Sequence, residues 1–170
     1  DAALETIEHI IKEKNLLDNK ILAIKLDTFA ADKNLTGLIG NQLMAKYQRP
    51  VLLLNKTADG WEGSGRGYDK SKFDNLREFL KDSGMIMYAE GHANALGVGI
   101  TDEWFNSFIE YSNRELAEFD FTPCYKVDYI FTGGDFRGSD IVKLAELKSL
   151  WGQGVEEPLI AIENIHVNTE

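Results

Sequence analysis

Several features that would define other classes of protein are missing from this 170-residue sequence. It contains a single cysteine, Cys124, so no disulfide can form within the chain. Its longest apolar runs, Pro50–Leu54 and Gly84–Ala89, are far shorter than the roughly 20 residues of a membrane-spanning helix. No basic and apolar leader sequence opens the chain. These absences exclude a disulfide scaffold and a membrane-spanning helix, and they favour a reducing, cytoplasmic location.

An excess of positive charge is missing as well. The chain has 18 Lys and Arg against 28 Asp and Glu, which gives a net charge of −10. Residues 1–81 hold a balance of +1, whereas residues 82–170 hold a balance of −11. A protein that binds nucleic acid by charge alone is basic overall, so contact with a polyanion must be local and lie in the first half. The acidic second half is either a solvated surface or a docking face for a protein partner.

What the sequence does contain is a globular composition, 44% hydrophobic and 27% charged, with alternating helix-like and strand-like segments. The pattern predicts strands at Ile21–Leu26, Val51–Leu54, Trp61–Arg66, Met85–Ala89 and Val98–Ile100, and helices that begin near Leu4, Thr36, Ser71 and Thr101. After Pro123 it predicts a strand from Tyr125 to Phe131, a helix capped by Ser139 and a strand at Pro158–Val167. We therefore expect an α/β fold, with a mixed sheet flanked by helices and a partial β-rich segment after residue 122.

The first cluster that can carry chemistry is Gly63–Gly67, which we expect to follow a strand and to precede the Ser71 helix. Glycine lets backbone amides approach a ligand, and an arginine such as Arg66 can hold a phosphate with two parallel hydrogen bonds. Gly60 and Gly65 have the glycine spacing of a P-loop, but Arg66 and Gly67 replace the Lys and Ser/Thr that it requires. A dinucleotide motif would need glycine where Tyr68 stands. The alternative is an ordinary hairpin or loop whose Arg66 is merely exposed.

The second cluster is Glu90–Gly97, in which small residues surround His92 after a predicted strand. The imidazole can donate to a phosphate oxygen or act as an acid or base, and it can equally be a structural histidine bonded to the backbone. A metal site is disfavoured, because Glu90 is the only other ligand type nearby and no second histidine or cysteine lies within sequence reach. The residues alone leave the first two interpretations open.

Together the two clusters resemble the DHHA1 domain, which accompanies the DHH catalytic domain in RecJ-type exonucleases and related phosphodiesterases. Gly63–Gly67 is similar to the family signature GSGRS, and Glu90–Gly97 is similar to GGHxxAAG. Leu35–Gly40 and Tyr47–Val51 also look like the helix and following strand of that family. The resemblance covers roughly residues 20–118, and Gly65 looks more like RecJ than like the small-oligonucleotide phosphodiesterases.

The resemblance implies that this chain binds the substrate and that a missing DHH domain carries out the catalysis. The parent would be a Mn- or Mg-dependent 5′–3′ single-strand DNA exonuclease, a hydrolase of DNA repair and recombination. No Asp-His-His run occurs in this chain, so we expect it to hold no metal and to be inactive alone. The implied phosphate- and substrate-binding residues are Gly63, Ser64, Gly65, Arg66, Gly67, Gly91, His92, Asn94, Ala95 and Gly97. Arg66, Ser64 and the glycine amides would hold the phosphate, and His92 would contact the nucleotide near the scissile bond.

Three positions depart from the family pattern. Gly67 stands where the family has serine, Glu90 replaces the first glycine of the second signature, and Leu96 replaces an alanine. Glu90 adds negative charge beside the expected phosphate site. Beyond residue 122, Trp151–Gly154 with Pro158 weakly resembles the OB-type region that follows DHHA1 in RecJ.

The chain begins without methionine and ends within a predicted strand, so we interpret it as a piece of a longer protein. We expect residues 1–20 to be a connecting helix from a missing catalytic domain, residues 21–122 to form the DHHA1-like substrate-binding domain, and residues 123–170 to begin a truncated OB-like segment. The expected function is to position single-stranded DNA for hydrolysis, with weak DNA binding by the isolated chain. Two alternatives stay open. One is a phosphodiesterase for short oligonucleotides or cyclic dinucleotides, and the other is a non-catalytic RecJ-like scaffold that docks replication partners.

Overall fold

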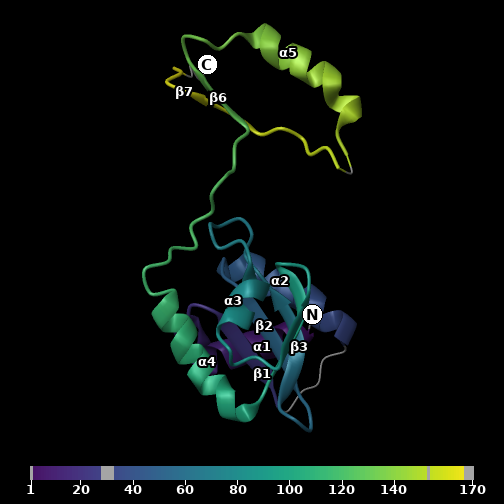
Figure 1. Ribbon diagram of the computed structural model, residues 1–170, viewed down its shortest axis with the longest axis vertical. Coiled ribbons are helices and arrows are strands. Elements are labelled where there is room, and N and C mark those ends of the chain that lie inside the picture. Colours follow the sequence, from purple (N-terminus) through teal and green to yellow (C-terminus); the bar gives the residue numbers. More distant parts are fainter. Residues whose placement is uncertain (1, 28–32, 153, 167–170) are drawn as a thin grey trace. The chain divides into compact units, whose positions relative to one another are not determined.

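The computed structural model describes residues 2–27, 33–152 and 154–166, and the chain divides into two units, Asp1–Cys124 and Tyr125–Glu170 (Figure 1). Within the described residues, no helix has the length and hydrophobicity needed to cross a membrane.

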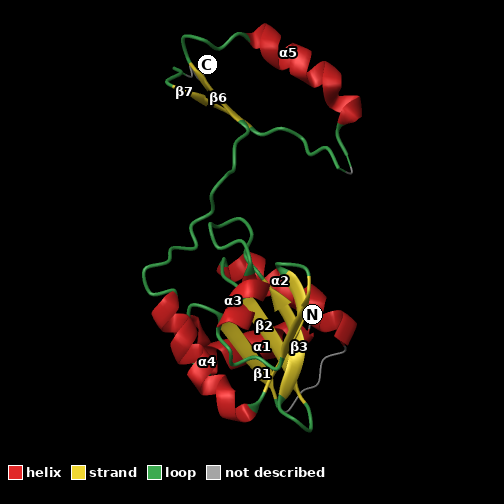
Figure 2. Ribbon diagram, in the orientation of Figure 1, coloured by secondary structure: helices red, strands yellow, loops and turns green. Residues whose placement is uncertain are grey.

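A mixed sheet forms the centre of the first unit (Figure 2). It has five strands in the order β1-β2-β3-β5-β4. The strands are β1 Leu22–Leu26, β2 Val51–Lys56, β3 Trp61–Arg66, β4 Tyr88–Gly91 and β5 Ala95–Ile100. Strands β1 and β2 run parallel, and every other neighbouring pair in this sheet is antiparallel. A parallel pair needs a crossover connection, and helix α2 supplies it between β1 and β2. The predicted mixed sheet flanked by helices is confirmed.

Helices pack against both faces of this sheet, but they cover the two faces unequally. They are α1 Ala2–Glu13, α2 Lys33–Tyr47, α3 Leu76–Asp82 and α4 Asp102–Glu115, with the short 3-10 helix η1 Leu16–Asp18 after α1. The core on the side of α3 and α4 takes buried side chains from all five strands. The core on the side of α1 and α2 takes its buried strand residues from β1 and β2 alone. On that side, among the described residues, the helices bury no side chains of β3, β5 or β4, and we call this surface of the three strands the open face.

Several boundaries differ from the predictions, because a hydrophobic run indicates which residues are buried and does not mark where a strand or helix ends. Strand β5 begins at Ala95 rather than at Val98, and β2 extends to Lys56 rather than ending at Leu54. Helix α3 begins at Leu76 under an Asn75 cap, whereas the hydroxyl of Ser71 donates to the carbonyl of Tyr68 and closes a turn. Helix α2 begins before Thr36, which therefore lies inside the helix. Strand β4 begins at Tyr88 rather than at Met85. The expected cap of α4 is confirmed, since the Thr101 hydroxyl accepts from the amide of Trp104.

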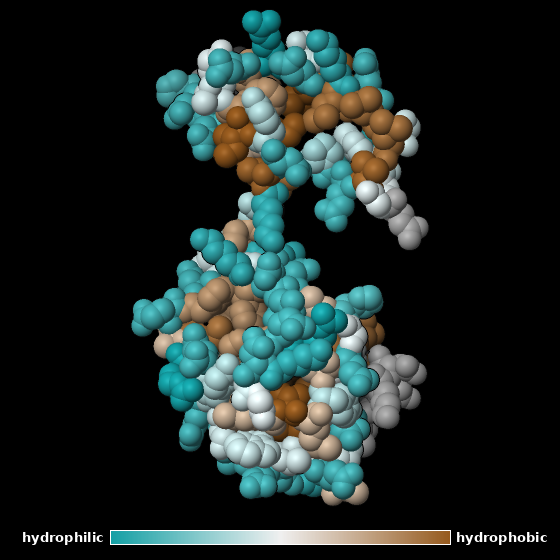
Figure 3. All heavy atoms as spheres, in the orientation of Figure 1, coloured by the Kyte–Doolittle hydropathy of each residue, from teal (hydrophilic) through white to brown (hydrophobic). Residues whose placement is uncertain are grey.

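The second unit is built from β6 Tyr129–Thr132, α5 Gly138–Glu146, the 3-10 helix η2 Leu147–Leu150 and β7 Ile160–Glu163. Strands β6 and β7 pair in parallel, with α5 between them in sequence. Strand β6 begins at Tyr129 rather than at the predicted Tyr125, and Arg137 rather than Ser139 is the residue that precedes α5. Strand β7 is shorter than the predicted Pro158–Val167, of which Val167 lies outside the described residues. Figure 3 shows hydrophobic residues at the surface of this unit. Its described residues hold these two strands, so the OB-type assignment stays a prediction.

Candidate functional site

The strand register arranges the side chains of the open face in rows. Directly paired residues of neighbouring strands project to the same side of a sheet. The rows across β3, β5 and β4 are Glu62–Gly99–Tyr88, then Ser64–Gly97–Glu90, then Arg66 with Ala95 of β5. The face therefore has an acidic end at Glu62 and a basic end at Arg66, with Gly97 and Gly99 as a floor without side chains and Glu90 beside Gly97 on β4.

Helix α2 forms a wall along this floor and is fixed to it by side chains. The hydroxyl groups of Thr36 and Ser64 lie 3.0 Å apart and share a hydrogen bond. Gly37 and Gly40 face Arg66: a β-carbon on Gly37 would lie 2.5 Å from Nη2 of Arg66, and one on Gly40 would lie 3.3 Å from its Cγ. Glycine is unfavourable inside a helix by roughly 1 kcal/mol relative to alanine, and here it makes room for the arginine.

Arg66 is the cation of this site. Its Nη1 donates to the carbonyl of Gly65 at 2.8 Å, which aligns the guanidinium along the end of β3. Partial burial lowers the pKa of Arg66, and no carboxylate among the described residues contributes to that shift. The group stays charged at neutral pH, because arginine is not deprotonated in proteins. A half-buried guanidinium without an acidic partner among the described residues can bind an anion such as a phosphate.

Strand β3 has the predicted bounds Trp61–Arg66 and contains Gly63 and Gly65, and Gly67 directly follows it. The expectation that the motif follows a strand and wraps its backbone around a ligand is therefore wrong. A β-carbon on Gly63 would overlap the carbonyl of Leu53, one on Gly65 would touch Leu52 and Leu96, and one on Gly67 would overlap the side-chain oxygen of Asn94. These glycines therefore allow close packing of strands and of a turn. The side chains of Ser64 and Arg66, rather than a wrapped backbone, face the open surface.

The second motif forms the turn between β4 and β5, where the amide of His92 donates to the carbonyl of Ala95 at 2.9 Å. Gly91 has a φ of 125° and its missing β-carbon would lie 2.8 Å from that same carbonyl, so this position requires glycine. The His92 side chain is exposed at this end of the sheet. Because Ala95 pairs with Arg66, the turn brings His92 to the basic end of the open face.

Asn94 has a positioning role that the sequence did not indicate. Its Oδ1 accepts from the amide of Leu76 at 3.2 Å, and its Nδ2 donates to the carbonyl of Asp74 at 2.7 Å. Its backbone carbonyl also accepts from the amide of Gly67 at 3.0 Å. These bonds hold the two motifs and the start of α3 together, and the substrate contact of Asn94 stays a prediction.

A cavity of about 440 Å³ opens at the acidic end of the face. Its lining residues are Thr36, Asn55, Lys56, Thr57, Glu62, Gly63, Ser64, Tyr88 and Gly97. Burial raises the pKa of Tyr88, and the charge of Glu62 together with a hydrogen bond to it raises that pKa further. Sequence reasoning missed Glu62 and Tyr88. The alternation of Glu62, Ser64 and Arg66 along a predicted strand was the available signal, whereas nothing local pointed to Tyr88.

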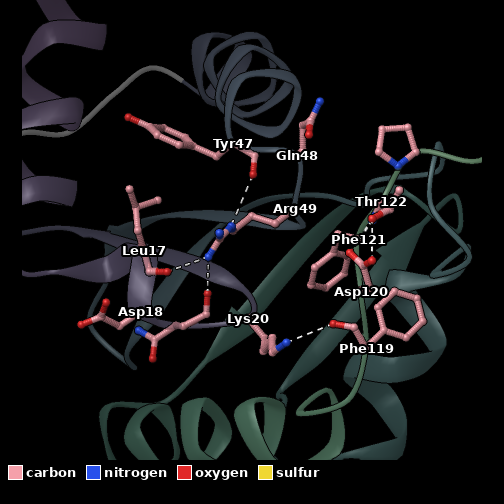
Figure 4. A pocket seen from close by; sticks show the side chains of 12 residues that line it. Leu17, Asp18, Lys20, Tyr47, Gln48, Arg49, Phe119, Asp120, Phe121 and Thr122 are labelled. Carbon is pink, nitrogen blue, oxygen red and sulfur yellow. Dashed lines mark hydrogen bonds between the residues drawn. The ribbon is translucent and has the colours of Figure 1, made fainter.

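A larger cavity, of about 650 Å³, lies where η1, the end of α2 and residues 119–123 meet (Figure 4). Its two cations are already bonded to the backbone. Arg49 Nη1 donates to the carbonyls of Leu17 and Asn19, at 2.8 and 2.7 Å, and Lys20 Nζ donates to that of Phe119 at 3.0 Å. Figure 4 shows these bonds joining the chain segments around the cavity. The open face, whose cation has no such set of partners, is the stronger candidate.

Over the residues that the structure describes, no three His, Cys, Asp or Glu side chains form a group that could hold a metal ion.

The relatives of this chain are single-strand DNA exonucleases by name. It is 35% identical over 175 residues to a Bacillus subtilis protein named as an SPbeta prophage-derived single-strand DNA-specific exonuclease, YorK, and the match covers 100% of this chain and 30% of YorK. It is 29% identical over 129 residues to the single-stranded-DNA-specific exonuclease RecJ of Haemophilus influenzae, covering 72% of this chain and 22% of RecJ. No family model matches the chain.

Solved structures show the same fold. RecJ of Thermus thermophilus in complex with Mn²⁺ aligns with a TM-score of 0.52 at 18% identity, over 95% of this chain and 24% of RecJ. The Mg²⁺ complex of the same protein gives 0.51 at 19% identity, over 94% and 25%.

The chain is thus a homologue of the RecJ-like single-strand DNA-specific exonucleases, as the two motifs predicted. It spans about 30% of the length of YorK and 22% of the length of the Haemophilus RecJ.

Proposed function

We propose that this chain is the DNA-binding part of a RecJ-like exonuclease, in which Arg66 and Ser64 hold a backbone phosphate of single-stranded DNA. Hydrolysis would be the task of a DHH domain outside this chain, where bound Mn²⁺ or Mg²⁺ activates the attacking water. The observation that carries the proposal is the position of Arg66, a half-buried guanidinium that borders an uncovered sheet face and has no acidic partner among the described residues.

The chemistry of the face suits a phosphodiester. A guanidinium binds two phosphate oxygens with parallel hydrogen bonds, and the neighbouring Ser64 hydroxyl can donate a third. Gly97, which pairs with Ser64, leaves the floor beside that hydroxyl without a side chain, since even an added β-carbon would have no neighbour closer than 3.9 Å. A nucleic acid strand can therefore approach the sheet closely at this point.

The acidic end of the face restricts where the phosphate can lie. Glu62 and Glu90 both raise the pKa of Tyr88 through their charge, so they act on the same small region. A phosphate beside them would be repelled, whereas a phosphate beside Arg66 would be attracted. The charge of the face thus changes along β3 from negative at Glu62 to positive at Arg66, and the phosphate lies at the Arg66 end.

Binding of a fluorescent, 5′-phosphorylated single-stranded oligonucleotide to the 170-residue chain tests the proposal. We expect weak binding at low salt that Arg66→Ala reduces by about tenfold or more, since a hydrogen bond to a charged group contributes roughly 1.5–3 kcal/mol. Arg114→Ala is the matched control, because Arg114 is an exposed arginine of α4 that pairs with Glu115 and its loss changes the net charge equally. Equal affinities of the two variants would overturn the proposal.

The proposed role of His92 is a contact with the nucleotide near the scissile bond, and its test needs the exonuclease that contains this chain. His92→Ala should lower turnover, because an imidazole near the reacting phosphate can stabilise developing charge. Its melting temperature should stay unchanged, since the side chain is exposed. A folded variant with an unaltered rate would remove His92 from the site.

A further inference from the structure

We infer that the cavity at the acidic end of the open face is a nucleobase subsite with a preference for guanine. This inference rests on the proposed function, because it takes the ligand at Arg66 to be a nucleotide. It assigns a role to Glu62, Tyr88 and Thr57, which lie outside both sequence motifs.

The spacing along β3 suits one nucleotide. Glu62, Ser64 and Arg66 alternate on the same side of the strand. At about 3.3 Å per residue, Glu62 is about 7 Å from Ser64 and about 13 Å from Arg66 along the strand. A phosphate between Arg66 and Ser64 therefore leaves the attached base over Gly97, beside Glu62 and Tyr88. The cavity volume of about 440 Å³ is within the usual range of small-ligand sites.

The floor of the cavity is shaped for a flat ring. A β-carbon on Gly99 would overlap the Tyr88 ring, so this ring lies directly against the backbone of β5. A β-carbon on Gly97 would lie 3.9 Å from the edge of the same ring. The Tyr88 ring and the glycine backbone of β5 thus provide a flat, apolar surface on which a base can stack.

The polar groups of the cavity select among the bases. The Glu62 carboxylate only accepts hydrogen bonds, and it retains accepting capacity beyond its bond with Tyr88. Guanine is the DNA base whose Watson–Crick edge offers two adjacent N–H donors, N1–H and N2–H, and a carboxylate can accept both. Adenine and cytosine place a ring-nitrogen acceptor beside their amino group, and thymine flanks its single N–H with two carbonyls, so each would bring an acceptor toward Glu62.

A second observation at the same cavity also points to a ligand. The hydroxyl of Thr57 lines the cavity, is itself inaccessible to solvent, and has no hydrogen-bond partner among the described residues. A buried hydroxyl without a partner is unfavourable, so such groups are rare. This hydroxyl can donate to an acceptor on the ligand, and guanine carries the acceptor O6 beside its N1–H.

The test compares 5′-phosphorylated oligonucleotides of the form pNTTTTT, with N as guanine, hypoxanthine, adenine, cytosine or thymine, in competition for the 170-residue chain. Hypoxanthine is the matched ligand control, because it keeps N1–H and O6 but lacks the N2 amino group. We expect guanine to bind at least about fivefold more tightly than each of the others, as a good bidentate contact discriminates.

Two variants locate the cause of the preference. Glu62→Gln should remove it, because the amide replaces one acceptor with a donor. Tyr88→Phe should retain it, since the Glu62 carboxylate and the aromatic ring both remain. A preference that survives in Glu62→Gln would overturn the inference. Equal affinities of the wild type for all five oligonucleotides would also overturn the inference. If Arg66→Ala then weakened binding of every oligonucleotide, the proposed function would still stand. Failure of every oligonucleotide to bind would instead overturn the proposed function.

Discussion

Gly37 of α2 and Arg66 of β3 share one space, because a β-carbon on Gly37 would lie 2.5 Å from Nη2 of Arg66. The two residues are far apart in the sequence and meet only where α2 packs along β3. The missing side chain at position 37 thus determines where the guanidinium lies.

Gly37→Ala should weaken binding of single-stranded DNA several-fold without lowering the melting temperature. Alanine is favoured over glycine inside a helix by up to about 1 kcal/mol, whereas its β-carbon displaces the flexible end of Arg66. Anisotropy titration and a thermal melt on the same preparation check both effects. Gly134→Ala is the control, because a β-carbon there meets nothing within 4 Å. Unchanged DNA affinity in Gly37→Ala would show that α2 does not position the guanidinium.

The salt dependence of DNA binding should decrease when Arg66 is replaced. Each phosphate neutralised on a single strand contributes about 0.7 to the slope of log K against log salt concentration. Arg66→Ala should therefore lower the magnitude of this slope by about 0.7, and Arg114→Ala should leave it unchanged. Affinities measured across a salt series give the slope directly. A slope that is equal in the wild type and Arg66→Ala would argue against a phosphate contact at Arg66.

Gly97→Val should abolish DNA binding while the fold remains intact. A β-carbon at Gly97 has no neighbour closer than 3.9 Å, so the strand can accept a side chain, and valine is favoured in strands. The branched side chain would occupy the floor between Ser64 and Glu90. Circular dichroism and a thermal melt report the fold, and anisotropy reports binding. Normal affinity in the folded variant would mean that DNA does not lie over Gly97.

Asn94→Ala should lower the free energy of unfolding by about 1–3 kcal/mol. The substitution leaves the amide of Leu76 and the carbonyl of Asp74 without their side-chain partners. Asn94→Asp retains an acceptor for Leu76 but loses the donor to Asp74, so its effect should be intermediate. Urea unfolding measures all three proteins. A fully stable Asn94→Ala protein with impaired DNA binding would support the substrate-contact role predicted from the motif.

Asp102 should make the stability of the first unit depend on acid pH. Hydrogen bonds from Lys56 and Trp61, with the nearby charge of Lys25, lower the pKa of Asp102 from 3.8 to about 2. Because the folded-state pKa is the lower one, this stabilisation is complete above pH 3.8 and is lost as the pH falls toward 2. Asp102→Asn should melt below the wild type at pH 7 and equal it near pH 2. Asp82→Asn, at the exposed end of α3, is the control. A constant difference between Asp102→Asn and the wild type at both pH values would exclude this linkage.

The sequence by itself determined the fold class and the location of the two motifs. Hydrophobic periodicity is a local property, so the alternation of helices and strands and the buried strands β1 and β2 could be inferred from neighbouring residues. The motif residues Ser64, Arg66 and His92 were found in the same way, because each motif is contiguous and both match one known family. Caps and strand ends were less certain, since Ser71 and Asn75 are both suitable cap residues and only hydrogen bonding separates them.

Which of these residues lie on the open face depends on the tertiary structure. Glu62 of β3 and Tyr88 of β4 are distant in sequence, but both pair with Gly99 of β5, the strand between them in the sheet. Because Gly99 has no side chain, the two side chains can meet above it. Asn94 and Gly67 belong to the motifs, yet their contacts hold the turn against α3. The open face exists because α1 and α2 bury strand residues of β1 and β2 alone on that side. Strand order and helix placement depend on packing between segments that are distant in the sequence. The local pattern of hydrophobic and polar residues does not show which distant segments pack together.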